Sequence, residues 1–188
     1  MYFSSNMTFQ YFFFDTYIGY FLQALPIALL VSAVYGFVRF RTDKEMTISM
    51  KLFSCMFVCY LTGLVCLVIG FDLMNIFWYK LFYGMDPGRT IDWFGGEIDF
   101  VPDFLNNISG ETIGNFLMFL PFGVLYPLSH KDCTWTKCVT IGFCVVASIE
   151  ILQPVFGRMF DLNDIILNIL GVVFSTSVFM SVKKIIKR

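Results

Sequence analysis

The sequence contains little charge and a single histidine. Asp, Glu, Lys and Arg make up 14% of its 188 residues, against about 25% in soluble domains. Hydrophobic residues make up 57% of the chain, and phenylalanine alone occurs 24 times. This composition excludes a soluble globular enzyme and is too apolar for a disordered chain. We therefore expect an integral membrane protein.

Other shortages exclude further classes of function. The net charge of −1 provides no basic field for a polyanion, so no nucleic-acid partner is expected. None of the six cysteines falls in a loop expected on the outer side of the membrane, which argues against a disulfide framework. His130 is expected at the cytoplasmic border of the membrane, far from the main cluster of polar residues on the outer side. A Ser-His-Asp or Cys-His catalytic arrangement is therefore not expected.

Long apolar runs define the expected fold. Runs long enough to cross a bilayer occur at about 17–38, 52–71, 113–129, 137–155 and 163–182. The predicted class is an all-α integral membrane protein in which about five transmembrane helices form a single domain over residues 1–188. Pro121 should kink the third helix, because proline cannot donate the hydrogen bond that the Leu117 carbonyl would accept.

The distribution of basic residues predicts the orientation. Ten of the 13 lysines and arginines lie in the first and third connections or at the C-terminal end, whereas Lys80, Arg89 and Arg158 lie on the other side. Cytoplasmic loops carry an excess of Lys and Arg. The N-terminus, the segment 72–112 and the turn 153–162 are therefore predicted outside the membrane, with the C-terminus in the cytoplasm.

The outer segment 72–112 mixes seven acidic residues with tryptophan, tyrosine and phenylalanine. Such an amphipathic segment is compatible with a short interfacial helix, broken at Asp86-Pro87-Gly88, that covers the helix ends beneath it. An ordinary solvated loop with membrane-belt aromatics is the alternative. Residues 1–16, rich in phenylalanine, are expected to form an interfacial helix as well.

Polar residues near the later spans concentrate at the predicted outer ends. On one helix face Glu150 and Gln153 are spaced i and i+3, and a seven-residue turn leads to a second polar face on the next helix. An antiparallel helical hairpin brings these faces together. The candidate ligand-binding residues are Asn115, Glu150, Gln153, Arg158, Asp161, Asp164 and Asn168, with Glu150 and Asp164 as candidates for any catalytic role.

Structural roles compete with functional ones for these residues. Asp161 and Asp164 fit positions where a carboxylate caps the first turn of a helix. Asn115 and Asn168 fit hydrogen-bonding contacts between helices, and Glu150 with Arg158 fits an ion pair. Three acids beside one arginine imply a proton on Glu150, a bound divalent cation or a cationic ligand. No cofactor is identified, and no metal ligand is assigned.

Three motifs carry a resemblance to a known family. They are Asn115-Phe116-Leu117-Met118-Phe119-Leu120-Pro121-Phe122-Gly123, Glu150-x-x-Gln153, and Arg158-x-x-Asp161-x-x-Asp164-x-x-x-Asn168-x-x-Gly171, preceded by Phe100-Val101-Pro102. Together they resemble the VanZ-like family of bacterial membrane proteins over about residues 100–181. The resemblance implies a polytopic protein of the bacterial cell envelope, in a family named for a teicoplanin-resistance protein.

Three classes of function remain open. The first is binding or modification of an amphiphilic envelope molecule, such as a lipid-linked glycan, a phospholipid head group or a lipoglycopeptide. The second is an enzyme that uses its carboxylates, or a divalent cation, on a lipid head group. The third is a structural or assembly subunit. The oligomeric state and the identity of the ligand do not follow from the sequence.

Overall fold

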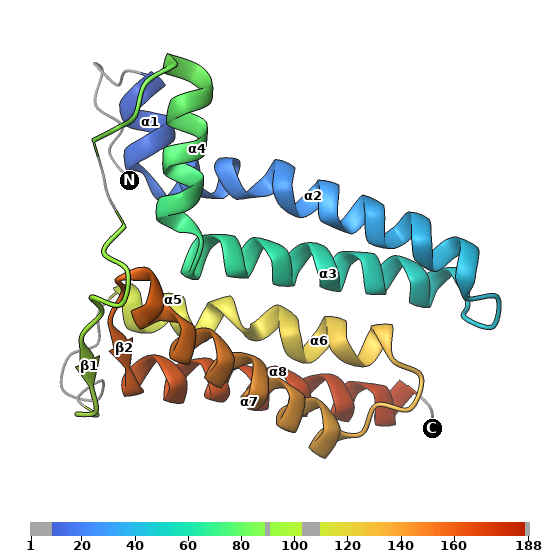
Figure 1. Cartoon of the computed structure of the whole chain (residues 1–188). Helices are drawn as coiled ribbons and strands as arrows, with labels where there is room; N and C mark the ends of the chain where they lie inside the picture. Colours follow the sequence, from blue (N-terminus) through green and yellow to red (C-terminus); the bar gives the residue numbers. More distant parts are fainter. Residues whose placement is uncertain (1–8, 89–90, 103–109, 187–188) are drawn as a thin grey trace.

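The computed structural model describes residues 9–88, 91–102 and 110–186, and these residues are mostly helical (Figure 1). The elements in chain order are α1 Phe9–Asp15, α2 Tyr17–Thr42, α3 Ile48–Val68, α4 Phe71–Tyr83, β1 Ile98–Asp99, α5 Gly110–Met118, α6 Leu120–Ser129, α7 Trp135–Leu152, the 3₁₀-helix η1 Gln153–Phe156, β2 Phe160–Asp161 and α8 Leu162–Ile186. The basic residues Arg89, Lys187 and Arg188, which entered the orientation argument, lie outside the described residues.

Five helical stretches in the described part are long and apolar enough to cross a membrane, which confirms the predicted fold class. They are Ile18–Thr42, Ile48–Val68, Thr112–Ser129, Trp135–Phe156 and Leu162–Ile186. Threonine side chains begin three of them, because each hydroxyl accepts a hydrogen bond from a free backbone N–H of the first turn. These N-caps are Thr16, Thr47 and Thr134.

The third stretch is divided in two, as Pro121 predicts. Helix α5 ends at Met118, and α6 begins at Leu120 with the proline in its first turn. The Phe122 N–H bonds to the Phe119 carbonyl at 3.2 Å, which leaves the Met118 carbonyl without its usual helical donor. The hydroxyl of Tyr60 on α3 donates to that carbonyl at 2.9 Å. A side chain from a neighbouring helix thus provides the hydrogen bond that the Met118 carbonyl loses at the break.

Helix α8 packs closely against α5, α6 and α7 where small residues face it. A Cβ placed on Gly123 of α6 would collide with Ser175 and Thr176, and one on Gly171 would collide with the Phe116 carbonyl of α5. Gly171 and Ser175, whose i, i+4 spacing is typical of small residues at close helix contacts, therefore lie in such a contact. Gly110 and Gly114 have the same spacing, which would predict a similar contact, but no described atom lies within 4 Å of a Cβ built on Gly114. It points away from the helix interface.

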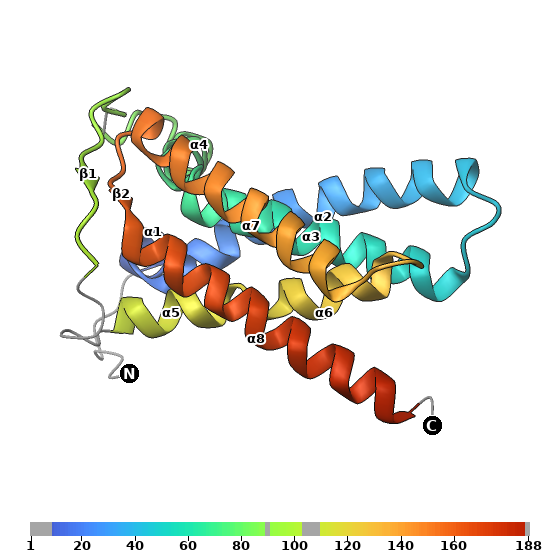
Figure 2. The ribbon, with the colours of Figure 1, turned by 90° about the horizontal axis from the view of Figure 1, so that it is seen from below.

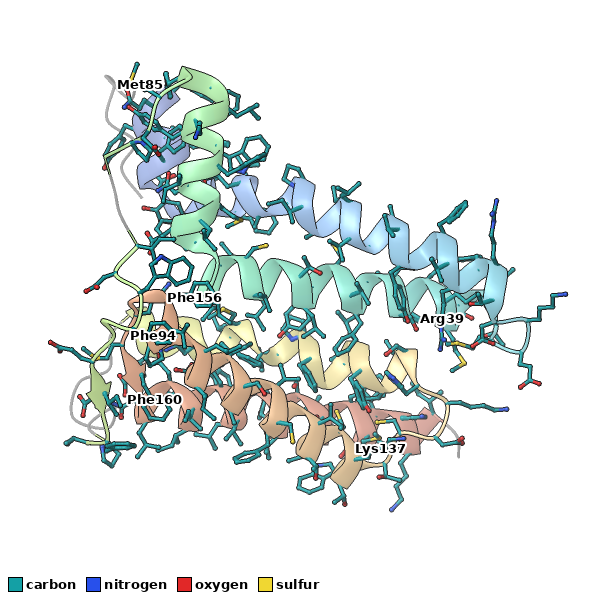
Figure 3. The ribbon with its side chains drawn as sticks, viewed as in Figure 1. Arg39, Met85, Phe94, Lys137, Phe156 and Phe160 are labelled. Atoms are coloured by element: carbon teal, nitrogen blue, oxygen red, sulfur yellow. The ribbon has the colours of Figure 1, made fainter. Side chains whose placement is uncertain are left out.

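The helices have two distinct ends. Helix α4 stands beside α1 at one end, and the short strands β1 and β2 lie at the same end in two views (Figures 1 and 2). We call this the strand end. Figure 3 places Phe94, Phe156 and Phe160 there, and Arg39 and Lys137 at the opposite, basic end.

The outer segment begins as helix α4, and its residues 91–99 cross the strand end in a largely extended stretch that we call the strap. Helix α4 ends at Tyr83, before the expected break, because Gly84 adopts a left-handed conformation with a φ of 67°. The backbone then pairs with the turn after α7: the Phe94 N–H donates to the Val155 carbonyl at 3.1 Å, and the Phe160 N–H to the Glu97 carbonyl at 2.8 Å. In this part the segment covers helix ends and is not a free loop.

The helix α1, predicted near the N-terminus, packs against α4 through aromatic rings. Phe13 meets Trp78 and Phe82 edge to face, at centroid distances of 6.1 and 5.5 Å. Phe14 contacts Tyr79 at 5.2 Å. Aromatic side chains of this kind favour the boundary between a membrane and water, so the α1–α4 pair fits an interfacial position at the strand end.

Candidate functional site

A cavity of about 610 Å³ opens among the helices at the strand end. Its polar lining consists of Tyr20, Asp72, Asn115, Glu150, Gln153, Arg158, Asp164 and Asn168, and its apolar lining of Leu67, Val68, Phe71, Met118, Phe119 and Ile149. Helices α2, α3, α4, α5, α7 and α8 all contribute. We call this space the polar cavity. Its size falls in the range of about 300–1,000 Å³ that is typical of small-molecule sites.

The turn after α7 brings three of the polar groups together. Pro154 lies in the first turn of η1, and Gly157 has a φ of 74°, which reverses the chain toward β2. The reversal places the Arg158 N–H on the Gln153 carbonyl at 3.1 Å. Glu150, one helical turn before Gln153, lies on the same face of α7. Glu150 and Gln153 therefore share one helix face, as their i, i+3 spacing predicted.

Two oxygen atoms at this cavity are buried without a hydrogen-bond donor in the described residues. Glu150 is 1% exposed and Asn168 is 3% exposed. The Glu150 Oε2 and Asn168 Oδ1 atoms receive no hydrogen bond from any described group. Burial of a polar atom without a partner is costly, so nearly all such atoms in proteins have one. Two unsatisfied acceptors on facing helices indicate a place for a donor from outside the described residues.

Asn115 and Asp164 form a contact between α5 and α8. The Asn115 amide donates to the Asp164 Oδ1 atom. This bond supports the interpretation of Asn115 as interhelical glue, and it also orients one Asp164 oxygen. Asp164 is half-buried and still lines the cavity. The structural and the ligand-binding interpretations are therefore compatible for this pair.

Arg158 reaches the polar cavity but forms no ion pair there with any residue that the structure describes. It is half-buried in the cavity wall, and its charge acts on Glu150 together with those of Asp164 and Asp161. Within the described ranges, however, the one ion pair is Arg39 with Asp43 at the basic end. The expected direct pairing of Arg158 with Glu150 is therefore absent, and the guanidinium lines the cavity without a carboxylate in contact.

Asp161 lies beside Glu150 and acts on it through its charge, but its side chain has a different role from those of the other candidates. Its Oδ1 atom accepts the Asn163 N–H at 2.7 Å, which confirms the helix-capping interpretation. Its backbone belongs to β2, where it pairs in parallel register with Asp99 of β1. Asp161 does not line the polar cavity. The remaining six candidate residues all do.

The sequence did not indicate Tyr20 or Asp72 as part of this site. Asp72 lies in the first turn of α4 and Tyr20 in the first turn of α2. Asp72 was visible as one of seven outer acids, but nothing in its spacing singled it out. Its inclusion makes three carboxylates, those of Asp72, Glu150 and Asp164, beside one arginine. The excess of negative charge that the sequence predicted is therefore kept, and the charge of Asp161, which acts on Glu150 from outside the lining, adds to it.

The polar cavity combines hydrogen-bond acceptors with one cationic side chain. Within the described ranges no group of three or more His, Cys, Asp or Glu side chains is arranged to hold a metal ion. The predicted divalent cation therefore stays a prediction. Chemically, the cavity offers hydrogen-bond acceptors at Glu150 and Asn168, one cationic group at Arg158, and an apolar wall below them.

These features define the class of protein: a multi-pass membrane protein with a polar cavity at one end of its helices. Comparison with known families identifies it further. The chain belongs to the VanZ/LLP1 family, whose model matches residues 28–184. The match includes α2 and α3, where the sequence motifs gave no resemblance. No curated protein and no solved structure matches the chain.

Proposed function

We propose that this VanZ-like membrane protein binds the polar head group of an amphiphilic envelope molecule in the polar cavity. The observation that carries the proposal is the pair of buried acceptors, Glu150 Oε2 and Asn168 Oδ1, without a donor in the described residues. A ligand that brings ammonium or hydroxyl donors would satisfy both atoms. The ligand classes proposed are a lipid-linked glycan, a phospholipid head group and a lipoglycopeptide.

Each polar residue of the cavity has a role in this proposal. Glu150 and Asn168 accept hydrogen bonds from the ligand. Arg158, which forms no ion pair with a described carboxylate, binds a phosphate or carboxylate of the ligand. Asp164, oriented by Asn115, receives a further donor, and Gln153 orients the head group.

The proposed location is the outer leaflet of the bacterial cell membrane. The orientation follows from the basic end, which carries most of the lysines and arginines and is therefore placed in the cytoplasm. The strand end, with its polar cavity, then faces the cell exterior, where envelope precursors and glycopeptides occur. A change in susceptibility to teicoplanin is the phenotype that the family resemblance makes worth measuring.

Substitutions that keep side-chain size provide the test. We would compare Glu150→Gln, Arg158→Lys and Asp164→Asn with Asp161→Asn as the matched control, because Asp161 lies outside the cavity. Membrane abundance and thermal stability are measured first, and the phenotype and the co-purified lipids are then scored per folded molecule. We expect the three cavity variants to fold but lose function, and Asp161→Asn to keep it.

The outcomes separate the open classes of function. Loss of retained ligand supports a binding protein. A Glu150→Gln variant that keeps the ligand but loses activity assigns a carboxylate-dependent enzyme instead. If all three cavity variants retain wild-type function, the cluster is structural and the proposal is wrong.

A further inference from the structure

A second, apolar space runs along the membrane-spanning helices next to the polar cavity. This groove has a volume of about 390 Å³ and lies among α2, α3 and the broken third span. Ala24 and Ala28 of α2 and Gly63 of α3 line it with small side chains, and Leu25 and Leu125 form opposite walls. Ala24 and Ala28 are 2% and 3% exposed. The groove is thus recessed between helices of one chain.

The groove and the polar cavity meet at two residues. Leu67 of α3 and Met118 of α5 line both spaces. Met118 is the last residue of α5, and its carbonyl accepts the Tyr60 hydroxyl where the third span breaks. The polar and the apolar space are therefore adjacent, and the helix break lies where they meet.

We propose that the groove holds a hydrocarbon chain of an aminophospholipid whose head group occupies the polar cavity. This inference rests on the proposed function and names its ligand class. The two unsatisfied acceptors match a primary ammonium, which carries three donors, and the Arg158 guanidinium matches a phosphate. A zwitterionic head group brings both charges in one molecule.

A hydrocarbon chain fits the groove better than a helix of a partner protein. A helix with side chains is about 10–12 Å across, whereas the groove is recessed between α2 and α3 and has a volume in the small-molecule range. A partner helix would also leave the ionic groups of the adjoining cavity unsatisfied. Only an amphiphile fills the polar and the apolar space together.

The groove selects which hydrocarbon chain can bind, but it contributes little to the free energy of binding. Lipid tails are as apolar as leucine side chains, so a chain that moves from the bilayer into the groove gains no hydrophobic transfer energy. It gains close packing against the small residues instead. Filling the groove with a large side chain should therefore exclude the chain without changing the polar cavity.

The test fills the groove from two sides. Leu25→Trp on α2 and Leu125→Trp on α6 place an indole in it from opposite walls, so failure of one variant to fold leaves the other. Leu30→Trp is the matched control, because Leu30 is on the same helix as Leu25 and is 66% exposed. The purified, folded proteins in detergent are titrated with dioleoyl phosphatidylethanolamine, and lipid adducts are counted by native mass spectrometry. Dioleoyl phosphatidylglycerol, which lacks the ammonium, is the head-group control.

We expect about tenfold fewer phosphatidylethanolamine adducts in Leu25→Trp and Leu125→Trp, wild-type numbers in Leu30→Trp, and few phosphatidylglycerol adducts throughout. Unchanged adducts in both groove variants would overturn the inference, and so would a change in oligomeric state at constant adduct number, which would assign the groove to a second copy of the chain. If Glu150→Gln abolishes phosphatidylethanolamine adducts while the groove variants keep them, the proposed function stands and the groove assignment fails. If none of these variants changes the adducts, both fail.

Discussion

Replacing Gly171 with alanine should separate α8 from α5. A Cβ at this position would collide with the Phe116 carbonyl oxygen and would lie 3.5 Å from the Phe119 Cβ atom. The obstructing atom belongs to the backbone, so α5 must move as a unit to make room. Overpacking of this kind costs about 1–3 kcal/mol.

The higher helix propensity of alanine offsets part of that cost, by about 0.5–1 kcal/mol relative to glycine. The net expectation is a loss of about 0.5–2 kcal/mol in the free energy of unfolding. Gly114 on α5 is the matched control, because no described atom lies within 4 Å of a Cβ built on it. Gly114→Ala keeps the gain in propensity without the collision. The two substitutions should therefore change stability in opposite directions.

Reversible unfolding in mixed micelles, driven by an increasing fraction of sodium dodecyl sulfate, measures both variants. Asn115 is adjacent to Phe116 in α5 and donates to Asp164 of α8, so Gly171→Ala should also weaken ligand retention. Equal stability of the two alanine variants would refute the close α5–α8 contact.

Three further predictions concern orientation, capping and the helix break. A membrane-impermeant thiol reagent should label Asp92→Cys in intact cells and not Lys131→Cys; the reverse pattern would contradict the proposed orientation. Lys131 is exposed and suits this test better than native Cys133, because burial raises the pKa of the Cys133 thiol. Asp161→Ala should cost about 0.5–2 kcal/mol of stability and leave the phenotype per folded molecule unchanged, and a loss of function at normal stability would contradict the capping role. Tyr60→Phe should cost about 1–3 kcal/mol by leaving the Met118 carbonyl unsatisfied, and unfolding at the wild-type detergent fraction would show that the carbonyl has another partner.

Sequence patterns predicted the helices well because their causes are local. Apolar runs of sufficient length and Pro121 each act within a few residues of chain. The convergence of Glu150, Gln153 and Arg158 was also predictable, since a short turn joins their helices and helical spacing fixes their faces. Asp161 was also a candidate, but its position just before α8 already favoured a helix-capping role for its side chain.

The features of the site that the sequence did not predict depend on contacts between segments that are distant in the chain. Asp72 and Tyr20 reach the polar cavity only because α2 and α4 pack against α3, which in turn packs against α6, and no local pattern records that arrangement. The absence of the Glu150–Arg158 ion pair is likewise a matter of side-chain placement in three dimensions. Gly114 shows the converse error. Its spacing from Gly110 resembled a packing motif, yet the rotation of α5 about its own axis turns it away from the interface.

The parallel pairing of β1 with β2 also constrains the order in which the protein assembles. Ile98 pairs with Phe160 and Asp99 with Asp161, so the earlier strand has to wait until α5, α6 and α7 have been synthesised and inserted. The strap over the strand end therefore closes late, after the α7–α8 hairpin has formed. A ribosome-bound chain that stops before residue 160 would have three or four inserted helices but an unpaired strap, and its polar cavity would lack both Asp164 and the acceptor on Asn168.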